Sequence, residues 1–173
     1  MAFSLPSDLA VDWADNVGMI EDAAYLNAVG AAFNAEKAAL LGTVNNTAGA
    51  VVATSEVTRS GTYADLTTTT DSVTVTIGAS GMALVMLCSS MSCNAGTLYV
   101  GYAGSGANTI AASDTKALVF AQQYGNPFGQ FGGTFLETGL SAGSTVFKMK
   151  YRTSRTDWDA TFTNRRIAVI PWF

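Results

Sequence analysis

The sequence predicts a mainly β protein: an antiparallel, jelly-roll-like β-sandwich of about eight strands, preceded by an N-terminal arm and one α-helix. Apolar residues between positions 17 and 42 recur with helical spacing, whereas beyond Ala50 they alternate with polar residues. Clusters of Gly, Ser, Asn and Asp interrupt the alternating part, as turns between short strands do. We therefore divide the chain into an arm (1–16), a helix (17–42), a linker (43–49) and a β-sandwich head (50–173).

The arm carries large apolar side chains that follow neither a helical nor an alternating spacing. They are Phe3, Leu5, Leu9, Val11 and Trp13. So short a segment cannot bury them in a core of its own, and a group of exposed apolar side chains marks an interaction surface. We predict that these five residues attach the protein to a partner.

The predicted helix has a start signal and an end signal. Asn16 or Asp15 can cap its first turn, where the helix dipole also favours the acidic residues Glu21 and Asp22. Gly42 stands where a glycine commonly ends a helix. The polar sequence TVNNTAG that follows predicts a connector between the helix and the first strand.

One side of this helix carries a short, imperfect heptad seam, with large residues at one position and mostly small residues at the alternating one. The seam consists of Met19, Ala23, Leu26, Gly30, Phe33 and Leu40. The seam suits packing against copies of the same helix or docking on a larger assembly. Packing of a lone helix on its own sandwich is the alternative, and both interpretations stay open at this point.

Eight segments have the spacing and the β-branched or aromatic content of strands. They are residues 51–58, 72–77, 82–90, 97–102, 116–123, 133–137, 145–152 and 160–170. In SVTVTIG, Val73, Val75 and Ile77 alternate with polar residues, so one face is buried and the other meets water. GMALVMLCSS is apolar on both faces, which predicts that its outer face contacts another subunit.

Composition argues against several classes of partner. The formal net charge is −4 and the isoelectric point is about 4.6, so no basic surface is available for phosphates and we expect no nucleic-acid partner. No apolar run reaches the ~20 residues that span a membrane, and the N-terminus lacks the pattern of a signal peptide. We expect synthesis in a cytoplasm and no membrane partner. Only 13% of residues are charged, which suits packing against other subunits.

Catalysis has little support, because the chain contains no histidine. Asp157 and Asp159 form a carboxylate pair of the kind that acid–base chemistry uses, but a solvated loop or an intersubunit salt bridge explains them better. Cys88 and Cys93 cannot complete a zinc site by themselves. They form either two buried free thiols or a disulfide. We predict a protein that is not an enzyme, with no cofactor and no metal.

Both ends of the chain resemble small virion proteins of tailed phages that infect actinobacteria, known as minor tail proteins, head fibres or capsid decoration proteins. AYLNAVG at residues 24–30 is similar to their virion-anchored helix. AGSTVFKMKYR at 142–152 and NRRIAVIPW at 164–172 are similar to the last strands of a trimeric sandwich like the heads of tumour necrosis factor and C1q. The resemblance implies a homotrimer on the virion, no enzyme activity, and contacts with the major capsid protein or another virion protein.

Two functions remain from the sequence. One is a structural protein on the capsid surface that docks through its arm and helix and displays the sandwich outward. The other is a minor tail protein or tail-fibre head that binds a host-surface glycan. Aromatic and charged residues suitable for an intersubunit contact or for such a ligand are Tyr124, Phe128, Phe131, Tyr151, Arg152, Arg155, Asp157 and Trp158.

Overall fold

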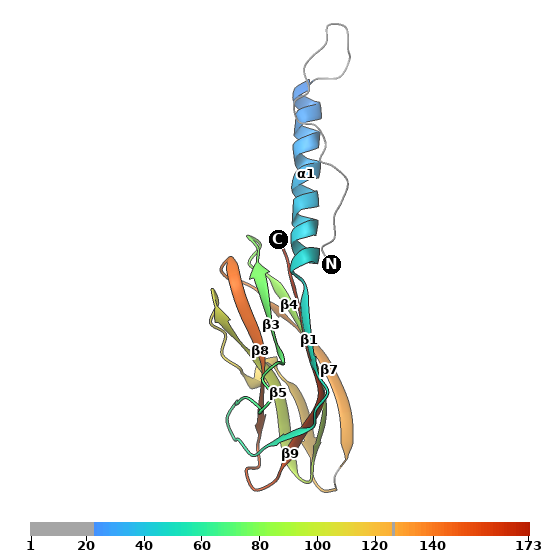
Figure 1. Ribbon diagram of the computed structural model, residues 1–173, viewed down its shortest axis with the longest axis vertical. Helices are drawn as coiled ribbons and strands as arrows, with labels where there is room; N and C mark the ends of the chain where they lie inside the picture. The colour runs from blue at the N-terminus through green and yellow to red at the C-terminus, as the bar shows by residue number, and fades with distance from the viewer. Residues whose placement is uncertain (1–22, 126) are drawn as a thin grey trace.

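The computed structural model describes residues 23–125 and 127–173, and it shows a β-sandwich with a single long helix extending from one end (Figure 1). The described residues form one α-helix, one 3-10 helix at Asp114–Lys116 and nine strands. The α-helix is α1 (Ala23–Asn46) and the strands are β1 (Ala48–Val52), β2 (Glu56–Thr58), β3 (Ser72–Ile77), β4 (Ala83–Cys93), β5 (Gly96–Gly106), β6 (Leu118–Gln122), β7 (Phe128–Glu137), β8 (Gly143–Thr153) and β9 (Ala160–Pro171).

The strands form two antiparallel sheets, as predicted. The first sheet has the order β1, β9, β4, β7, with β2 also paired to β9, and the second has the order β3, β8, β5, β6. Strands from the beginning and the end of the chain therefore pair with each other, β1 with β9 and β3 with β8, while β4 pairs with β7 and β5 with β6. This nested antiparallel pairing is that of a jelly roll.

The core lies between the two sheets and follows the alternation in the sequence. In β3, Val73, Val75 and Ile77 are buried and the threonines between them are exposed. In β8, Phe147, Met149 and Tyr151 have no accessible surface, while the lysines beside them point outward. The predicted burial of one face is confirmed for β3, and β8 shows the same alternation.

A β-bulge in β9 interrupts the first sheet. On β4 a single residue separates Cys88 from Ser90, whereas two residues separate their partners on β9, Arg166 and Thr163. One of those two, Asn164, has a positive φ of 51°. Before the bulge the even-numbered residues of β9 face the core, and after it the odd-numbered residues do, because a bulge inserts one extra residue into the strand.

The same bulge corrects one predicted strand. We expected a continuous strand over 51–58, but the structure has β1 and β2, which pair with β9 on either side of the bulge. Val52 pairs with Arg165 and Glu56 with Phe162, so three residues of the edge strand must span two of β9. The edge strand leaves the ladder at this point and rejoins it at Glu56.

The bulge also turns Arg165 into the core, where its side chain has no accessible surface. Its Nη1 donates to Asp71 Oδ2 at 3.2 Å, and the hydroxyl of Tyr151 donates to the same carboxylate oxygen. Glu56 lies 3.5 Å from Nη2. Because Tyr151 belongs to β8, this buried charge network joins the two sheets.

The helix is longer than predicted at its C-terminal end. It continues through Gly42 to Asn46, and β1 begins at Ala48, so the predicted linker over 43–49 is wrong. Gly42 serves a close approach instead of ending the helix: a Cβ there would lie 2.5 Å from the ring of Phe173. The side chains of Asn46 and Thr47 then cap the helix by donating to the carbonyls of residues 42 and 43 at 2.9 Å.

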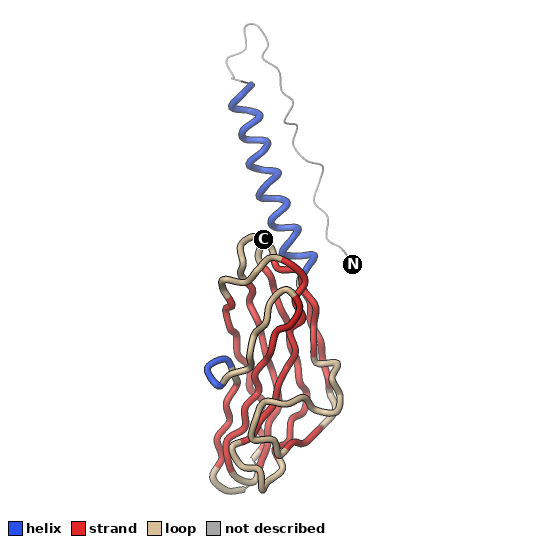
Figure 2. Tube along the Cα trace, turned by 90° about the vertical axis from the view of Figure 1, so that its left-hand side faces the viewer, coloured by secondary structure: helices blue, strands red, loops and turns tan. Residues whose placement is uncertain are grey.

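The helix continues the long axis of the sandwich and does not fold back on it (Figures 1 and 2). Its 24 residues correspond to about 36 Å at 1.5 Å per residue. It meets the sandwich at its last turns, next to β9. Among the described residues, no helix has the length and hydrophobicity that a membrane span requires.

We predict that Asp71→Asn lowers the free energy of unfolding by about 3 kcal/mol at neutral pH, because it leaves Arg165 buried without its closest counter-charge. Urea unfolding followed by circular dichroism would measure the change. The control is Asp65→Asn, which removes a partly exposed carboxylate paired with Lys148 and Lys150 and should cost less than about 1 kcal/mol. Equal losses in the two variants would contradict a structural role for the buried network.

Candidate functional site

The end of the sandwich opposite the helix is built from three chain segments that we call the distal tip. They are the β4–β5 turn at residues 94–95, the described part of the β6–β7 connection at 123–125 and 127, and the β8–β9 loop at 154–159. Strand register brings them together: Ser92 pairs with both Phe128 and Thr161, and Gly96 pairs with Gln122. In Figure 1 the start of β9 lies at the opposite end of the molecule from α1.

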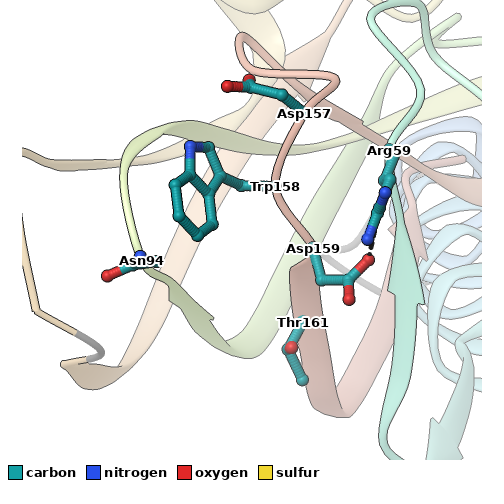
Figure 3. A pocket seen from close by; sticks show the side chains of 6 residues that line it. All are labelled: Arg59, Asn94, Asp157, Trp158, Asp159 and Thr161. Atoms are coloured by element: carbon teal, nitrogen blue, oxygen red, sulfur yellow. Dashed lines mark hydrogen bonds and ion pairs between the residues drawn. The ribbon is translucent and has the colours of Figure 1, made fainter.

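A pocket of about 430 Å³ opens at this tip (Figure 3). It is lined by Arg59, Asn94, Asp157, Trp158, Asp159 and Thr161. The indole of Trp158 stands between Asp157 and Asn94, and the Arg59–Asp159 pair forms the other side. Aromatic, amide, carboxylate and hydroxyl groups therefore converge on one space.

Two ion pairs fix the carboxylates of the pocket. Arg155 donates to both oxygens of Asp157, at 2.9 and 2.6 Å, and Arg59 Nε donates to Asp159 Oδ1 at 2.7 Å. The hydrogen bonds from Arg155 lower the pKa of Asp157 to about 2, and Arg59 lowers the pKa of Asp159. Both carboxylates are thus ionised acceptors at neutral pH, and the two guanidinium groups balance their charge.

Three exposed aromatic side chains gather at the tip. Tyr124 is 85% exposed, Phe128 64% and Trp158 40%. Tyr124 belongs to the β6–β7 connection and Phe128 is the first residue of β7. Large exposed aromatic rings beside charged groups are typical of binding surfaces.

The structure thus brings Tyr124, Phe128, Arg155, Asp157 and Trp158, all predicted contact residues, to one end of the molecule. They come from two segments about 30 residues apart, so the sequence alone did not place them together. Sequence reasoning missed Arg59, Asn94 and Thr161, which carry no motif. Pairing of β2 and β4 with the start of β9 brings these three to the pocket.

The other three predicted contact residues lie elsewhere. Tyr151 is a core residue without accessible surface, because it faces inward on β8, so its assignment as a surface contact is wrong. Arg152 points outward from the second sheet, where it stacks 3.6 Å from the centroid of the Tyr99 ring and pairs with Asp114. Phe131 packs against Phe120, with ring centroids 5.0 Å apart.

The outer faces of the two sheets differ in character. The second sheet carries Lys148 and Lys150, both paired with Asp65, beside the exposed threonines of β3. The first sheet has a mostly apolar outer face formed by side chains from all four main strands, namely Val51, Leu84, Met86, Leu136, Ala168 and Ile170. Arg166 of β9 is the charged, exposed residue that lies among them. A groove of about 230 Å³ crosses this face between β1, β9 and β4.

The large exposed apolar residues of α1 form a stripe along one side. They are Tyr25, Val29, Phe33, Leu40 and Val44, spaced by four, four, seven and four residues. Of the predicted seam, Phe33 and Leu40 lie in this stripe, Leu26 is half-buried and Gly30 is buried. Ala23 is the first described residue of the helix. Met19 and the arm residues Phe3, Leu5, Leu9, Val11 and Trp13 lie outside the described residues.

Cys88 and Cys93 are both free thiols, which corrects the disulfide alternative. Cys88 is half-buried on the outer face of the first sheet, and Cys93 is buried in the core. Within residues 23–125 and 127–173, no three side chains of the metal-binding types come together.

No known protein family and no curated protein matches the chain. Among solved structures, it is similar to the enzymatically active domain of tailspike protein 4 of bacteriophage CBA120, with 11% identity and a TM-score of 0.34. The match covers 75% of this chain and 20% of that one. A second similarity, at 9% identity and a TM-score of 0.30, is to the xylan-binding domain CBM22-1 of Paenibacillus barcinonensis Xyn10C, covering 75% of this chain and 88% of that one. Values this low carry no argument about activity.

We predict that Asp157 titrates at a pKa of about 2 in the folded protein, because Arg155 stabilises its ionised form. Carboxyl-resolved NMR titration would measure it. In Arg155→Gln the pKa should rise toward the ordinary aspartate value of about 3.9. Since the folded pKa is depressed, the pair stabilises the fold above that ordinary value and loses its effect as the pH falls through about 2. An unchanged titration in Arg155→Gln would show that the ion pair is absent in solution.

Proposed function

We propose that this protein is a phage virion structural protein, a homotrimeric capsid decoration or head-fibre protein. It docks on the assembled particle through its N-terminal arm and helix and displays the sandwich outward. The observation that carries the proposal is the contrast between the two sheets, since one outer face carries paired charges and the other is mostly apolar, with Arg166 as the charged residue lining its groove. An apolar sheet face of this kind calls for a covering surface.

A second copy of the same chain is the covering surface that also accounts for the helix. The first sheet runs along the length of the molecule, and α1 continues that direction (Figure 1). Copies packed side by side through this face would place their helices alongside one another. The stripe from Tyr25 to Val44 would then find its partners in the same assembly.

The direction of attachment follows from the two ends. The first described residue of the helix, Ala23, lies at the end of the helix farthest from the sandwich, and the arm precedes it in the sequence. The distal tip lies at the other end and carries the polar pocket. Attachment through the arm would therefore leave the tip facing away from the particle.

The tip favours a second candidate function, a minor tail protein or tail-fibre head that binds a host-surface glycan. The supporting observation is the group of exposed aromatic rings beside a pocket lined with hydrogen-bonding side chains. This function is compatible with the trimer and changes only the position of the protein on the virion.

We predict that the protein has three times its chain mass of 18.0 kDa in light scattering at micromolar concentration. Met86→Lys should reduce it to the mass of one folded chain, because a lysine on the apolar outer face would be buried without a counter-charge. The matched control is Thr74→Lys, an outward position on β3 of the charged sheet, which should remain trimeric.

Two outcomes would contradict this assembly. A monomeric wild-type protein at that concentration would exclude the homotrimer. A trimeric Met86→Lys variant would show that the copies associate through another surface. Circular dichroism of each variant separates loss of assembly from loss of fold.

We predict that removal of residues 1–16 leaves a folded trimer that no longer binds virions lacking the protein, because the sandwich has a core of its own. Trp13→Ala alone should weaken binding by about 2 kcal/mol, as expected for a buried Trp anchor. Co-sedimentation with decoration-free particles would measure both effects. Full binding by the truncated trimer would show that attachment runs through the sandwich.

A further inference from the structure

We propose that the pocket at the distal tip binds a neutral saccharide, with the indole of Trp158 as stacking platform and Asp157, Asp159, Asn94 and Arg59 as hydrogen-bonding groups. This inference names the ligand class for the second candidate function, the glycan-binding tail protein. It rests on that function because the tip must face away from the particle to reach a ligand.

The indole of Trp158 is an exposed apolar surface within the pocket. Trp158 is 40% exposed, although it stands in a pocket and is flanked on both sides in the sequence by carboxylates. In Figure 3 its ring projects into the space between Asp157 and Asn94. An aromatic ring held at the wall of a pocket offers a flat apolar surface. The C–H face of a pyranose ring is the complementary ligand surface, because its hydroxyl groups point outward from the edge.

Polar groups surround the Trp158 ring. A sugar hydroxyl both donates and accepts, so a saccharide site needs acceptors and donors within a few ångströms of one another. Asp157 and Asp159 supply acceptors, Arg59 supplies donors, and the amide of Asn94 supplies both. Arg59 uses its Nε for Asp159 Oδ1, and no described residue donates to the second oxygen of Asp159. Free hydrogen-bonding capacity therefore remains on both members of this pair.

The charges around the pocket balance one another. Asp157 and Asp159 are matched by Arg155 and Arg59, so the pocket has no net charge from these four side chains. An anionic ligand at the free donors of Arg59 would lie beside the ionised carboxylates of the pocket, and a cationic ligand at the carboxylates would lie beside the guanidinium groups, so each would meet like charge. A neutral ligand rich in hydroxyl groups meets neither obstacle.

Hydrogen bonds and close packing hold the β8–β9 loop in place. The backbone N–H of Arg155 donates to Thr153 Oγ1 at 3.2 Å, and that of Thr97 donates to Ser154 Oγ at 2.8 Å. Gly96, at a φ of 112°, leaves room for the stem of Arg155, since a Cβ there would lie 2.6 Å from its Cγ. The loop that carries Trp158 is therefore positioned before any ligand binds, which lowers the entropy cost of binding.

The test is titration of the intact wild-type protein with hexasaccharides by isothermal calorimetry. Neutral probes are cellohexaose, maltohexaose and mannohexaose, an anionic probe is hexagalacturonate, and a cationic probe is the chitosan hexamer. We expect at least one neutral probe to bind and the two charged probes to bind at least tenfold more weakly. Trp158→Ala should lower the affinity at least tenfold, and Trp158→Phe should retain part of it.

The matched control is Val119→Ala, which removes another exposed apolar side chain, on β6 outside the pocket, and should leave saccharide affinity unchanged. Absence of binding to every neutral probe up to about 10 mM would overturn the proposal. Preference for a charged probe, or equal affinity of Trp158→Ala and wild type, would also overturn it.

Light scattering of the same samples separates this inference from the proposed assembly. A trimer that binds no neutral probe would contradict the saccharide site and leave the trimer intact. A monomer that binds a neutral probe through Trp158 would contradict the trimer and leave the site intact. Loss of the trimer in Trp158→Ala would show that the tip is a subunit contact, which would overturn the saccharide site.

Discussion

The bulge in β9 is the constraint on which the rest of the sandwich depends. β9 pairs with β1, β2 and β4, so any change in its phase is passed to every neighbour. At Asn164 and Arg165 the phase changes, and from there Ile167 and Val169 face the core while Ala168 faces outward. A buried arginine is a consequence of this change, and the hydrogen bonds with Asp71 compensate its burial in part. The same step divides the edge strand into β1 and β2.

The phase of β9 also decides the character of the surfaces. With Ala168 and Ile170 pointing outward, beside Leu84 and Met86 of β4, the first sheet has an apolar exterior at the end near the helix. Beyond the bulge, the small polar residues Thr161 and Thr163 take the outward positions of β9 toward the tip. Apolar surface and helix thus lie toward one end, and the polar pocket lies at the other. This polarity suits a protein that is anchored at one end and exposes the other.

Periodicity predicted most of this fold, because alternation and helical spacing are local properties. It failed where a distant residue decides the local structure. Gly42 resembles a helix end, but the ring of Phe173 from the other end of the chain packs against it and the helix continues. Sequence proximity groups Tyr151 with exposed residues, although the alternation of β8 places it in the core. The tip pocket needed Arg59 and Asn94, which reach it only through strand pairing. No local signal could have indicated either residue.

Alkylation of Cys88 tests most directly whether the apolar face is covered by another copy. This thiol lies half-buried on the outer face of the first sheet, and Cys93 in the core provides an internal reference. In the native protein at micromolar concentration, Cys88 should react with a small thiol reagent about tenfold more slowly than in folded Met86→Lys, and Cys93 should stay unreacted in both. Equal rates at Cys88 in the two proteins would contradict the account, because the face would then be open to solvent in the native state.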